Sequence, residues 1–95
     1  MFDPTILVLA SLANGDKHGY AIMEDVASFA GVRLGPGTLY GAITRLEQRS
    51  LIRAVASADR RQPYSLTSVG REYLTLQLNH LQRVVKTGVQ RLRHA

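Results

Sequence analysis

The stretch from Gly35 to Glu47, with the sequence GPGTLYGAITRLE, places the strongest constraint on how this chain can fold. Pro36 suits the first position of a helix, because the N–H that proline lacks would have no partner there. Leu39, Ile43 and Leu46 follow at the i, i+4 and i+7 spacing of one buried helix face. The stretch therefore predicts a short amphipathic helix that begins at Pro36.

The opposite face of this predicted helix consists of unusually small residues. At about 100° per residue, this face and its flanks hold Gly37, Gly41, Thr44 and Gln48, with Thr38, Arg45 and Arg49 beside them. A glycine in a helix costs about 0.5–1 kcal/mol relative to alanine. Small residues on an exposed face let a large partner approach closely, so we interpret this face as a recognition surface.

Positive charge is concentrated in the same part of the chain. The net charge is +5, but residues 1–30 hold one lysine against four carboxylates, a net −3. Residues 31–95 hold eleven lysines and arginines against three carboxylates, a net +8. Such a distribution is typical of a surface that binds a polyanion. The alternative is that the arginines only solvate the surface of a basic protein.

Composition excludes several classes of protein. The 95 residues are enough for one domain, and the absence of cysteine excludes disulfides and thiolate metal sites. No apolar run approaches the roughly 20 residues of a membrane span. The amino end carries no basic segment of the kind that opens a secretory signal, so we expect a cytoplasmic protein that does not bind membranes.

Nothing in the sequence indicates catalysis. No nucleophile elbow, phosphate-binding loop or paired-carboxylate pattern is present, so we expect neither an enzyme nor a cofactor. His80 and His94 lie fourteen residues apart, so one helix cannot chelate a metal ion with both. A metal sensor is therefore the weaker alternative, and no metal site is predicted.

Two further helices are predicted before Pro36. The first runs from Pro4 to about Ala13, with Asp3 as its N-cap and Phe2 placed to pack on Leu7. It is apolar on nearly every side, so it must be covered on most sides, and a second subunit is one candidate for that cover.

The second helix runs from about His18 to Phe29. Its inner face should include Ile22, Val26 and either Phe29 or Ala30. A tight connection that contains glycine leads from it to Pro36, which makes a helix-turn-helix arrangement.

A β-hairpin is predicted after these helices. Residues 51–55 and 62–66 are rich in branched or alternating apolar residues, and the polar segment between them ends with Arg60 and Arg61. Because Pro63 has no N–H to donate, we expect either that its strand lies at an edge or that Pro63 occupies a position that donates no hydrogen bond, which suits an isolated two-stranded wing.

The last predicted element is a helix of about 25–28 residues that begins after a cap at Thr67 or Ser68. Its apolar stripe, which we interpret as a dimerisation surface, consists of Leu74, Leu78, Leu81, Val85 and Leu92, with Gly88 in the missing position. A helix of this length projects beyond a small domain and needs a partner. The alternative is that it folds back on residues 4–13 of the same chain.

Several short motifs resemble the PadR family of transcriptional regulators. They are His18-Gly19-Tyr20, Gly37-Thr38-Leu39-Tyr40, Leu46-Glu47, Leu51-Ile52 and Tyr64-Ser65-Leu66-Thr67 followed by Gly70. Each is weak alone, but their order and spacing cover nearly the whole chain. The resemblance implies a homodimer that binds a two-fold operator, usually as a repressor released by a small molecule or another signal. The length resembles the small subfamily with a single helix after the wing.

The sequence departs from the family pattern at two points. Ser50 stands where the family commonly has a glycine before Leu-Ile, which predicts a tighter or differently capped turn into the wing. The chain has no tryptophan, so drug binding by indole stacking, which some relatives show, does not carry over.

The fold class expected from these observations is mainly α with a small β-hairpin. It is a winged helix-turn-helix DNA-binding region over residues 1–67 and a long C-terminal dimerisation helix over 68–95, in one compact domain overall. The expected partners are a double-stranded DNA operator, a second copy of the chain and a small-molecule effector at the dimer interface. The residues expected to line the effector site or, alternatively, to form part of the dimer core are Leu9, Leu12, Leu78 and Val85.

The residues expected to contact DNA are Gly37, Thr38, Tyr40, Thr44, Arg45, Gln48, Arg49, Arg60 and Arg61. Thr44, Arg45 and Gln48 are candidates for base edges, whereas Arg49 suits phosphate. The two wing arginines suit the backbone or a narrow minor groove. Tyr40 lies between the buried and outer faces, so packing is an equal alternative for it. The alternative function for the whole chain is a winged-helix interaction or assembly module that does not bind DNA.

Overall fold

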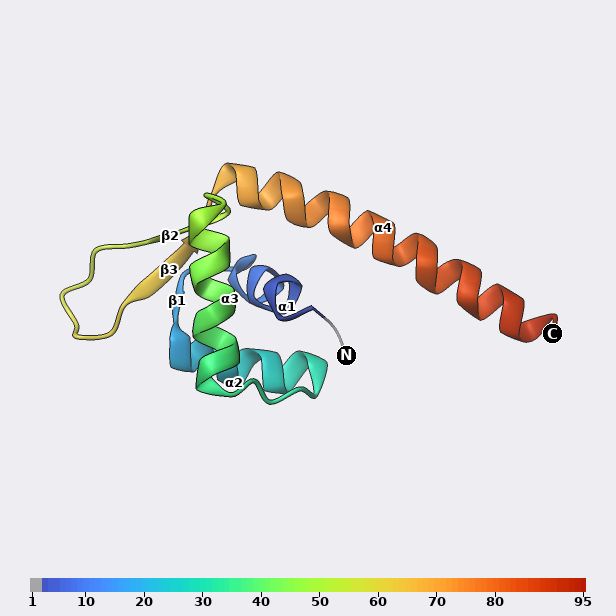
Figure 1. Ribbon diagram of the computed structural model, residues 1–95, viewed down its shortest axis with the longest axis horizontal. Coiled ribbons are helices and arrows are strands. Elements are labelled where there is room, and N and C mark those ends of the chain that lie inside the picture. The colour runs from blue at the N-terminus through green and yellow to red at the C-terminus, as the bar shows by residue number, and fades with distance from the viewer. Residues whose placement is uncertain (1–2) are drawn as a thin grey trace.

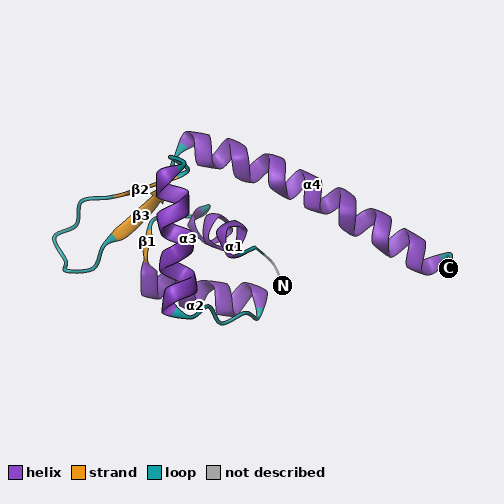
Figure 2. Ribbon diagram, viewed as in Figure 1, coloured by secondary structure: helices purple, strands orange, loops and turns teal. Residues whose placement is uncertain are grey.

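The computed structural model describes residues 3–95 and contains four helices and three short strands in that range. In chain order the elements are α1 (Pro4–Leu12), β1 (Lys17–His18), α2 (Gly19–Ala30), α3 (Pro36–Gln48), β2 (Ile52–Ala54), β3 (Pro63–Leu66) and α4 (Ser68–Arg93). The helices α1, α2 and α3 form the body, the loop of residues 55–62 extends from one side of it, and α4 leaves from the other (Figure 1). The expected fold class, mainly helical with a small hairpin, is confirmed (Figure 2).

Helix α1 lies at the centre of the body. The side chain of Asp3 caps it by accepting a hydrogen bond from the backbone N–H of Thr5 at 2.9 Å. Val8, Leu9 and Leu12 are fully buried, because α1 packs against α2, α3, α4 and β3 of the same chain. The expected cover on most sides is thus present without a second subunit. Phe2, expected to pack on Leu7, lies outside the described residues.

Helix α2 begins as the sequence predicts. His18 is its N-cap, and the His18 Nδ1 accepts a hydrogen bond from the backbone N–H of Ala21 at 3.3 Å. The helix ends at Gly31, whose φ of 66° is the left-handed conformation that glycine adopts without strain. Of the two candidates for the last inner position, Ala30 is half-buried and Phe29 is 51% exposed.

Helix α3 buries the apolar face that its sequence predicts. Leu39, Ile43 and Leu46 are almost completely inaccessible to solvent, and Ala42 widens their stripe. At about 25 cal/mol per Å² of apolar area, fully burying a leucine or isoleucine side chain contributes about 1.5–3 kcal/mol. This stripe fixes α3 on α1, with its opposite side outward.

The turn after α3 is a Schellman motif. The Leu51 N–H donates to the Leu46 carbonyl at 3.0 Å, and the Ser50 N–H donates to the Glu47 carbonyl at 3.0 Å. Ser50 has a φ of 59°, the only positive φ at a non-glycine residue among residues 3–95. Serine here adopts the left-handed conformation that glycine would adopt, so the departure from the family pattern leaves the motif itself in place.

The sheet corrects the expectation for the wing. Its order is β1-β3-β2, all antiparallel, with His18 opposite Pro63 and Ile52 opposite Leu66. The hairpin is present, but β3 is the central strand, so the predicted isolated two-stranded wing is wrong, and so is the edge-strand alternative for Pro63. Pro63 is tolerated because it is the first residue of β3, and its carbonyl still accepts from the Val55 N–H at 3.0 Å.

Helix α4 is joined to the end of α3 by a close contact between backbones. Thr67, its N-cap, donates its hydroxyl to the carbonyls of Ser50 and Leu51 and its N–H to the Leu51 carbonyl. A Cβ on Gly70 would lie 1.9 Å from the Leu51 carbonyl oxygen, so only glycine allows this approach. We call these contacts the α3–α4 junction. From it α4 extends for 26 residues, as predicted, in a molecule that measures 55 × 26 × 20 Å.

Candidate nucleic-acid interface

The outer face of α3, defined as Gly37, Gly41, Thr44 and Gln48, is open to solvent except for Gly41, which is half-buried. No atom lies within 4 Å of where a Cβ on Gly37 would stand. The Thr44 hydroxyl donates to the Tyr40 carbonyl one turn earlier, at 2.9 Å. Because that bond occupies its only donor, Thr44 presents a methyl group and an acceptor lone pair outward.

Tyr40 stands at the edge of this face and packs against the start of α2. The residue is 49% exposed, and a Cβ on Gly19 would lie 2.3 Å from the Tyr40 hydroxyl oxygen. The missing side chain of Gly19 is therefore what makes room for the tyrosine. The packing alternative for Tyr40 thus has a contact in the structure, whereas its contact with DNA stays a prediction.

Two arginines flank the outer face on the side of α1 and α4. The Arg49 guanidinium stacks over the Tyr73 ring of α4, with 4.7 Å between its carbon and the ring centroid. Hydrogen bonds from the hydroxyl and N–H of Thr5 lower the pKa of Asp3, and the charges of Arg45 and Arg49 lower it further. This flank thus combines two cations with one ionised carboxylate.

Two more arginines, Arg60 and Arg61, lie on the opposite flank, in the loop of residues 55–62, which we call the wing loop. Asp59 organises the loop by accepting from the Arg61 N–H at 3.3 Å and pairing with the Arg61 Nε at 3.4 Å. Hydrogen bonds from the backbone N–H groups of Arg61 and Arg60, and the Arg61 charge, lower the pKa of Asp59. The Arg61 Nη1 lies 3.2 Å from the His18 Nε2, which connects the wing loop to the start of α2.

All nine residues expected to contact DNA are exposed. Helix α3 stands between the two cationic flanks, with the wing loop on one side and α4 on the other (Figure 1). Sequence reasoning placed His18 only at the start of the second helix and missed its contact with Arg61 across 43 residues of sequence. It also missed the stacking of Arg49 on Tyr73. Neither contact has a local sequence signal, because each joins elements that the fold brings together.

The apolar stripe of α4 divides into two parts. Leu74 is 4% exposed and belongs to the core of this chain, so its assignment to a dimerisation surface is corrected. Leu81 is half-buried, whereas Leu78, Val85 and Leu92 are exposed. We call these four residues the α4 seam. The alternative of folding back on α1 therefore holds for the first half of α4 alone.

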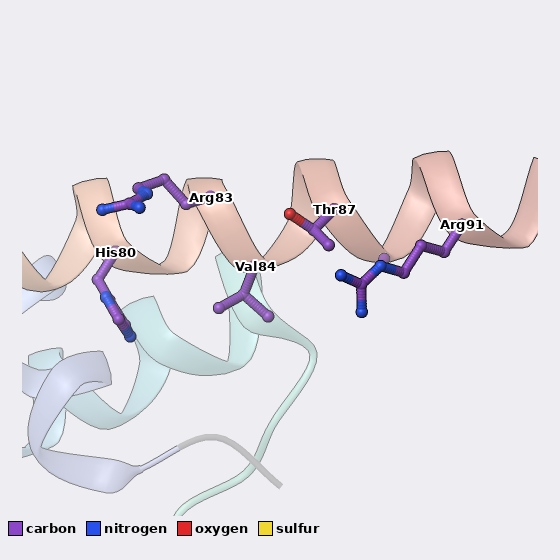
Figure 3. A pocket seen from close by; sticks show the side chains of 6 residues that line it. His80, Arg83, Val84, Thr87 and Arg91 are labelled. Carbon is purple, nitrogen blue, oxygen red and sulfur yellow. The ribbon is translucent and has the colours of Figure 1, made fainter.

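The distal half of α4 is open along its length. A shallow hollow of about 450 Å³ is lined by His80, Arg83, Val84, Thr87, Gly88 and Arg91. Figure 3 shows the His80 and Val84 side chains on the side of α4 that faces the helical body. Leu9 and Leu12 are sealed in the core, so they line no site between subunits in this conformation. Within residues 3–95, no three potential metal-binding side chains come together, and no helix is long and apolar enough to cross a bilayer.

The arrangement of three helices, with α3 exposed beside a small sheet whose loop carries two arginines, defines a winged helix-turn-helix protein. Residues 8–76 match the transcriptional regulator PadR-like family, and the chain belongs to this family. The resemblance drawn from the sequence motifs is thereby confirmed.

Solved structures of the same fold include regulators of this family. The chain is similar to a PadR family transcription regulator from Clostridium difficile, with a TM-score of 0.87, 28% identity and coverage of 96% of this chain and 99% of that one. A transcriptional regulator from Clostridium thermocellum has a TM-score of 0.80 and 25% identity over 87% of this chain and 86% of that one. BpsR from Bordetella bronchiseptica shares the fold, with a TM-score of 0.74 and 20% identity over 92% of this chain and 59% of that one.

Among curated proteins, the chain is 44% identical over 82 residues to an uncharacterized 37.1 kDa protein in transposon TN4556 of Streptomyces fradiae. That match covers 86% of this chain but only 24% of the relative's length. An uncharacterized protein X of Lysinibacillus sphaericus is 28% identical over 75 residues, which cover 73% of this chain and 69% of that protein. The family model thus makes the chain a member of the transcriptional regulator PadR-like family, whereas these two relatives are uncharacterized.

Proposed function

We propose that this chain binds duplex DNA sequence-specifically, as a homodimeric cytoplasmic repressor that a small molecule or another signal releases. The observation that carries the proposal is the open, small-residue outer face of α3 between two cationic flanks. An α-helix fits the major groove of B-DNA, and the wing loop of such a protein reaches the adjacent backbone or minor groove. Gly37 and Thr38 would meet the backbone where α3 enters the groove.

The side chains on α3 suit different bases. An arginine can bond the O6 and N7 of guanine in a bidentate manner, which is the role proposed for Arg45. Gln48 suits the N6 and N7 of adenine. Thr44, whose hydroxyl proton is bonded to the Tyr40 carbonyl, retains a methyl group that suits the methyl group of thymine. Arg49, held against Tyr73, is positioned for phosphate.

A second copy of the chain is the proposed partner of the α4 seam. A 26-residue helix is about 39 Å long, and Val85 and Leu92 on it are 62% and 80% exposed. Apolar side chains repeating along one side of a projecting helix are covered when two such helices pair. A two-fold dimer would place two α3 helices on a two-fold operator.

Release by a ligand is supported by analogy alone. The BpsR neighbour has DNA binding that is regulated by 6-hydroxynicotinic acid, and it shares the fold of this chain. A ligand of this chain would bind where α4 meets its partner, with Leu78 and Val85 as lining residues.

Duplex binding over a series of salt concentrations tests the proposal. Binding that is tight at low salt and weakens steeply as salt rises is expected, because phosphate contacts release counterions. Negligible binding at low salt by an intact dimer would contradict it and favour the interaction or assembly module. Arg45→Ala should weaken binding to an operator selected from genomic fragments by about 1–3 kcal/mol. An equal loss on duplexes of mixed sequence would make Arg45 a phosphate contact.

Sedimentation of charged variants tests the dimer separately. Val85→Asp, in the α4 seam, should yield monomers, because a carboxylate would be buried between the two helices. Leu76→Asp is the matched control, since Leu76 is 68% exposed and lies on the opposite side of α4. A Val85→Asp chain that stays dimeric would show that the seam is not the interface.

A further inference from the structure

A cleft of about 250 Å³ lies where the start of α2, the start of α3 and the wing loop meet. Its lining includes His18 from the edge of the sheet, Tyr40 from α3, and Arg60 and Arg61 from the wing loop. Two of these side chains come from elements far apart in the sequence and contact each other. They are His18 and Arg61, whose ring and guanidinium nitrogens are 3.2 Å apart.

Both ring nitrogens of His18 have a contact, but in a neutral imidazole only one of them can accept a hydrogen bond. Its Nδ1 accepts from the Ala21 N–H at 3.3 Å, which requires that Nδ1 carries no proton. In a neutral imidazole the proton is then on Nε2, so Nε2–H is a donor. Arg61, whose guanidinium has donors only, faces that same Nε2. In the other tautomer Nε2 accepts from Arg61, but Nδ1–H no longer caps α2.

The orientation of Arg61 is fixed from its other side. Asp59 pairs with the Arg61 Nε at 3.4 Å and also accepts the Arg61 backbone N–H. A guanidinium has five N–H donors, so this pairing leaves four, on the two terminal nitrogens. One of these nitrogens faces His18. With α2 capped, the cleft therefore holds two donor groups 3.2 Å apart, and neither accepts a hydrogen bond from the other.

We propose that His18 and Arg61 together bind one phosphate of the DNA backbone. A phosphodiester has only acceptors, so it accepts from the His18 Nε2–H and from Arg61 at once, while the His18 Nδ1 continues to cap α2. Arg60, in the same lining, adds positive charge. The phosphate would fasten the wing loop to the start of α2. This inference rests on the proposed DNA binding and names two residues that carry it.

The test measures binding of a fluorescent mixed-sequence duplex over a salt series, because a phosphate contact acts on any sequence. Arg61→Gln should reduce the slope of log affinity against log salt by about 1. His18→Asn keeps a capping side chain, since asparagine is a good N-cap, but lacks the Nε2 donor. It should weaken binding about two- to tenfold, the value of one hydrogen bond, without changing the slope.

The double variant identifies the two residues as one site. Its loss should be smaller than the product of the two single losses, because either substitution alone disrupts the shared contact. Arg83→Gln is the matched control for charge, since Arg83 is exposed on α4, far along the chain from the cleft. Losses that multiply independently, or variants that bind as tightly as the unmodified chain, would overturn the proposal while leaving the proposed function intact.

Nitrogen NMR of His18 in the unmodified chain provides a readout that needs no variant. The Nε2–H tautomer is expected in the complex with the duplex, and an unprotonated Nε2 there would refute the phosphate contact. A response to inorganic phosphate equal to the response to the duplex would assign the cleft to a free anion and also overturn the proposal. If the unmodified chain binds no duplex at low salt, the proposed function itself fails, and this inference with it.

Discussion

Replacement of Ser50 by glycine should stabilise this protein. Ser50 is held in the left-handed conformation, with a φ of 59°, by the two hydrogen bonds that close the Schellman motif after α3. Its carbonyl accepts the Thr67 hydroxyl at 2.8 Å, a contact that glycine would keep. The substitution therefore removes only an exposed side chain and the steric cost of its Cβ.

The magnitude follows from two opposing effects. An L-residue in the left-handed region costs roughly 1–2 kcal/mol, and glycine removes that cost. Glycine also loses more backbone entropy on folding, which offsets about 0.5–1 kcal/mol of the gain. The net stabilisation is about 0.5–1 kcal/mol, which for a domain of this size raises Tm by about 2–8 °C.

Thermal unfolding by circular dichroism at one fixed protein concentration is the assay. Ser50→Ala is the first control, because alanine keeps the Cβ and should not raise Tm. Gly31→Ala is the second, since Gly31 has a φ of 66° with open space around it, and a Cβ there should lower Tm. A Ser50→Gly chain no more stable than the unmodified one, alongside a destabilised Gly31→Ala chain, would refute the reasoning.

Three further predictions concern α3, its neighbour α2 and the cap of α1. Gly37→Ala should leave Tm unchanged or raise it, because nothing lies near the added Cβ. The same variant should lower duplex affinity in a binding titration. Unchanged affinity would contradict the idea that Gly37 lets DNA approach the helix closely. Gly19→Ala should lower Tm, because its Cβ would lie 2.3 Å from the Tyr40 hydroxyl oxygen, and Tyr40→Ala in the same chain should restore part of the loss. Asp3→Ala should lower the free energy of unfolding in urea by about 1 kcal/mol at neutral pH, whereas Asp3→Asn keeps the cap. Because the pKa of Asp3 is lowered from 3.8, its contribution is present above that value and should vanish as pH falls through the lowered pKa.

The helices could be predicted from the sequence because their signals are local. The apolar spacing in α3, the proline at its start and the threonine cap of α4 all act within a few residues. Strand β1 could not be predicted, because Lys17 and His18 are two residues without a strand pattern. They form a strand only by pairing with Tyr64 and Pro63, more than forty residues later. That pairing also makes β3 central, which Pro63 alone would have argued against.

In the candidate interface, too, the features with local sequence signals could be predicted and the contacts between distant elements could not. Helical geometry predicts which residues of α3 point outward, so the outer face could be assigned before the fold was known. The partners of those residues could not, because His18, Tyr73 and Asp3 approach the arginines from other elements. Leu74 shows the same limit on α4: its periodicity matches the α4 seam, but only the fold places it inside the core.

The α3–α4 junction lets selection change what the far end of α4 contacts without changing how α4 is placed relative to α3. It consists of backbone carbonyls, Thr67 and Gly70, and Leu74 in the core holds the next turns of α4, so the direction in which α4 leaves the body is set before its exposed distal half begins. Residues 82–95 are all exposed, and substitutions among them change what α4 meets without moving α3. If α4 pairs and α3 reads DNA as proposed, duplicated copies in one cell can diverge in this tail until they stop forming mixed pairs while still reading the same DNA. Divergence in α3 alone would give the opposite result, different DNA sites with shared subunits.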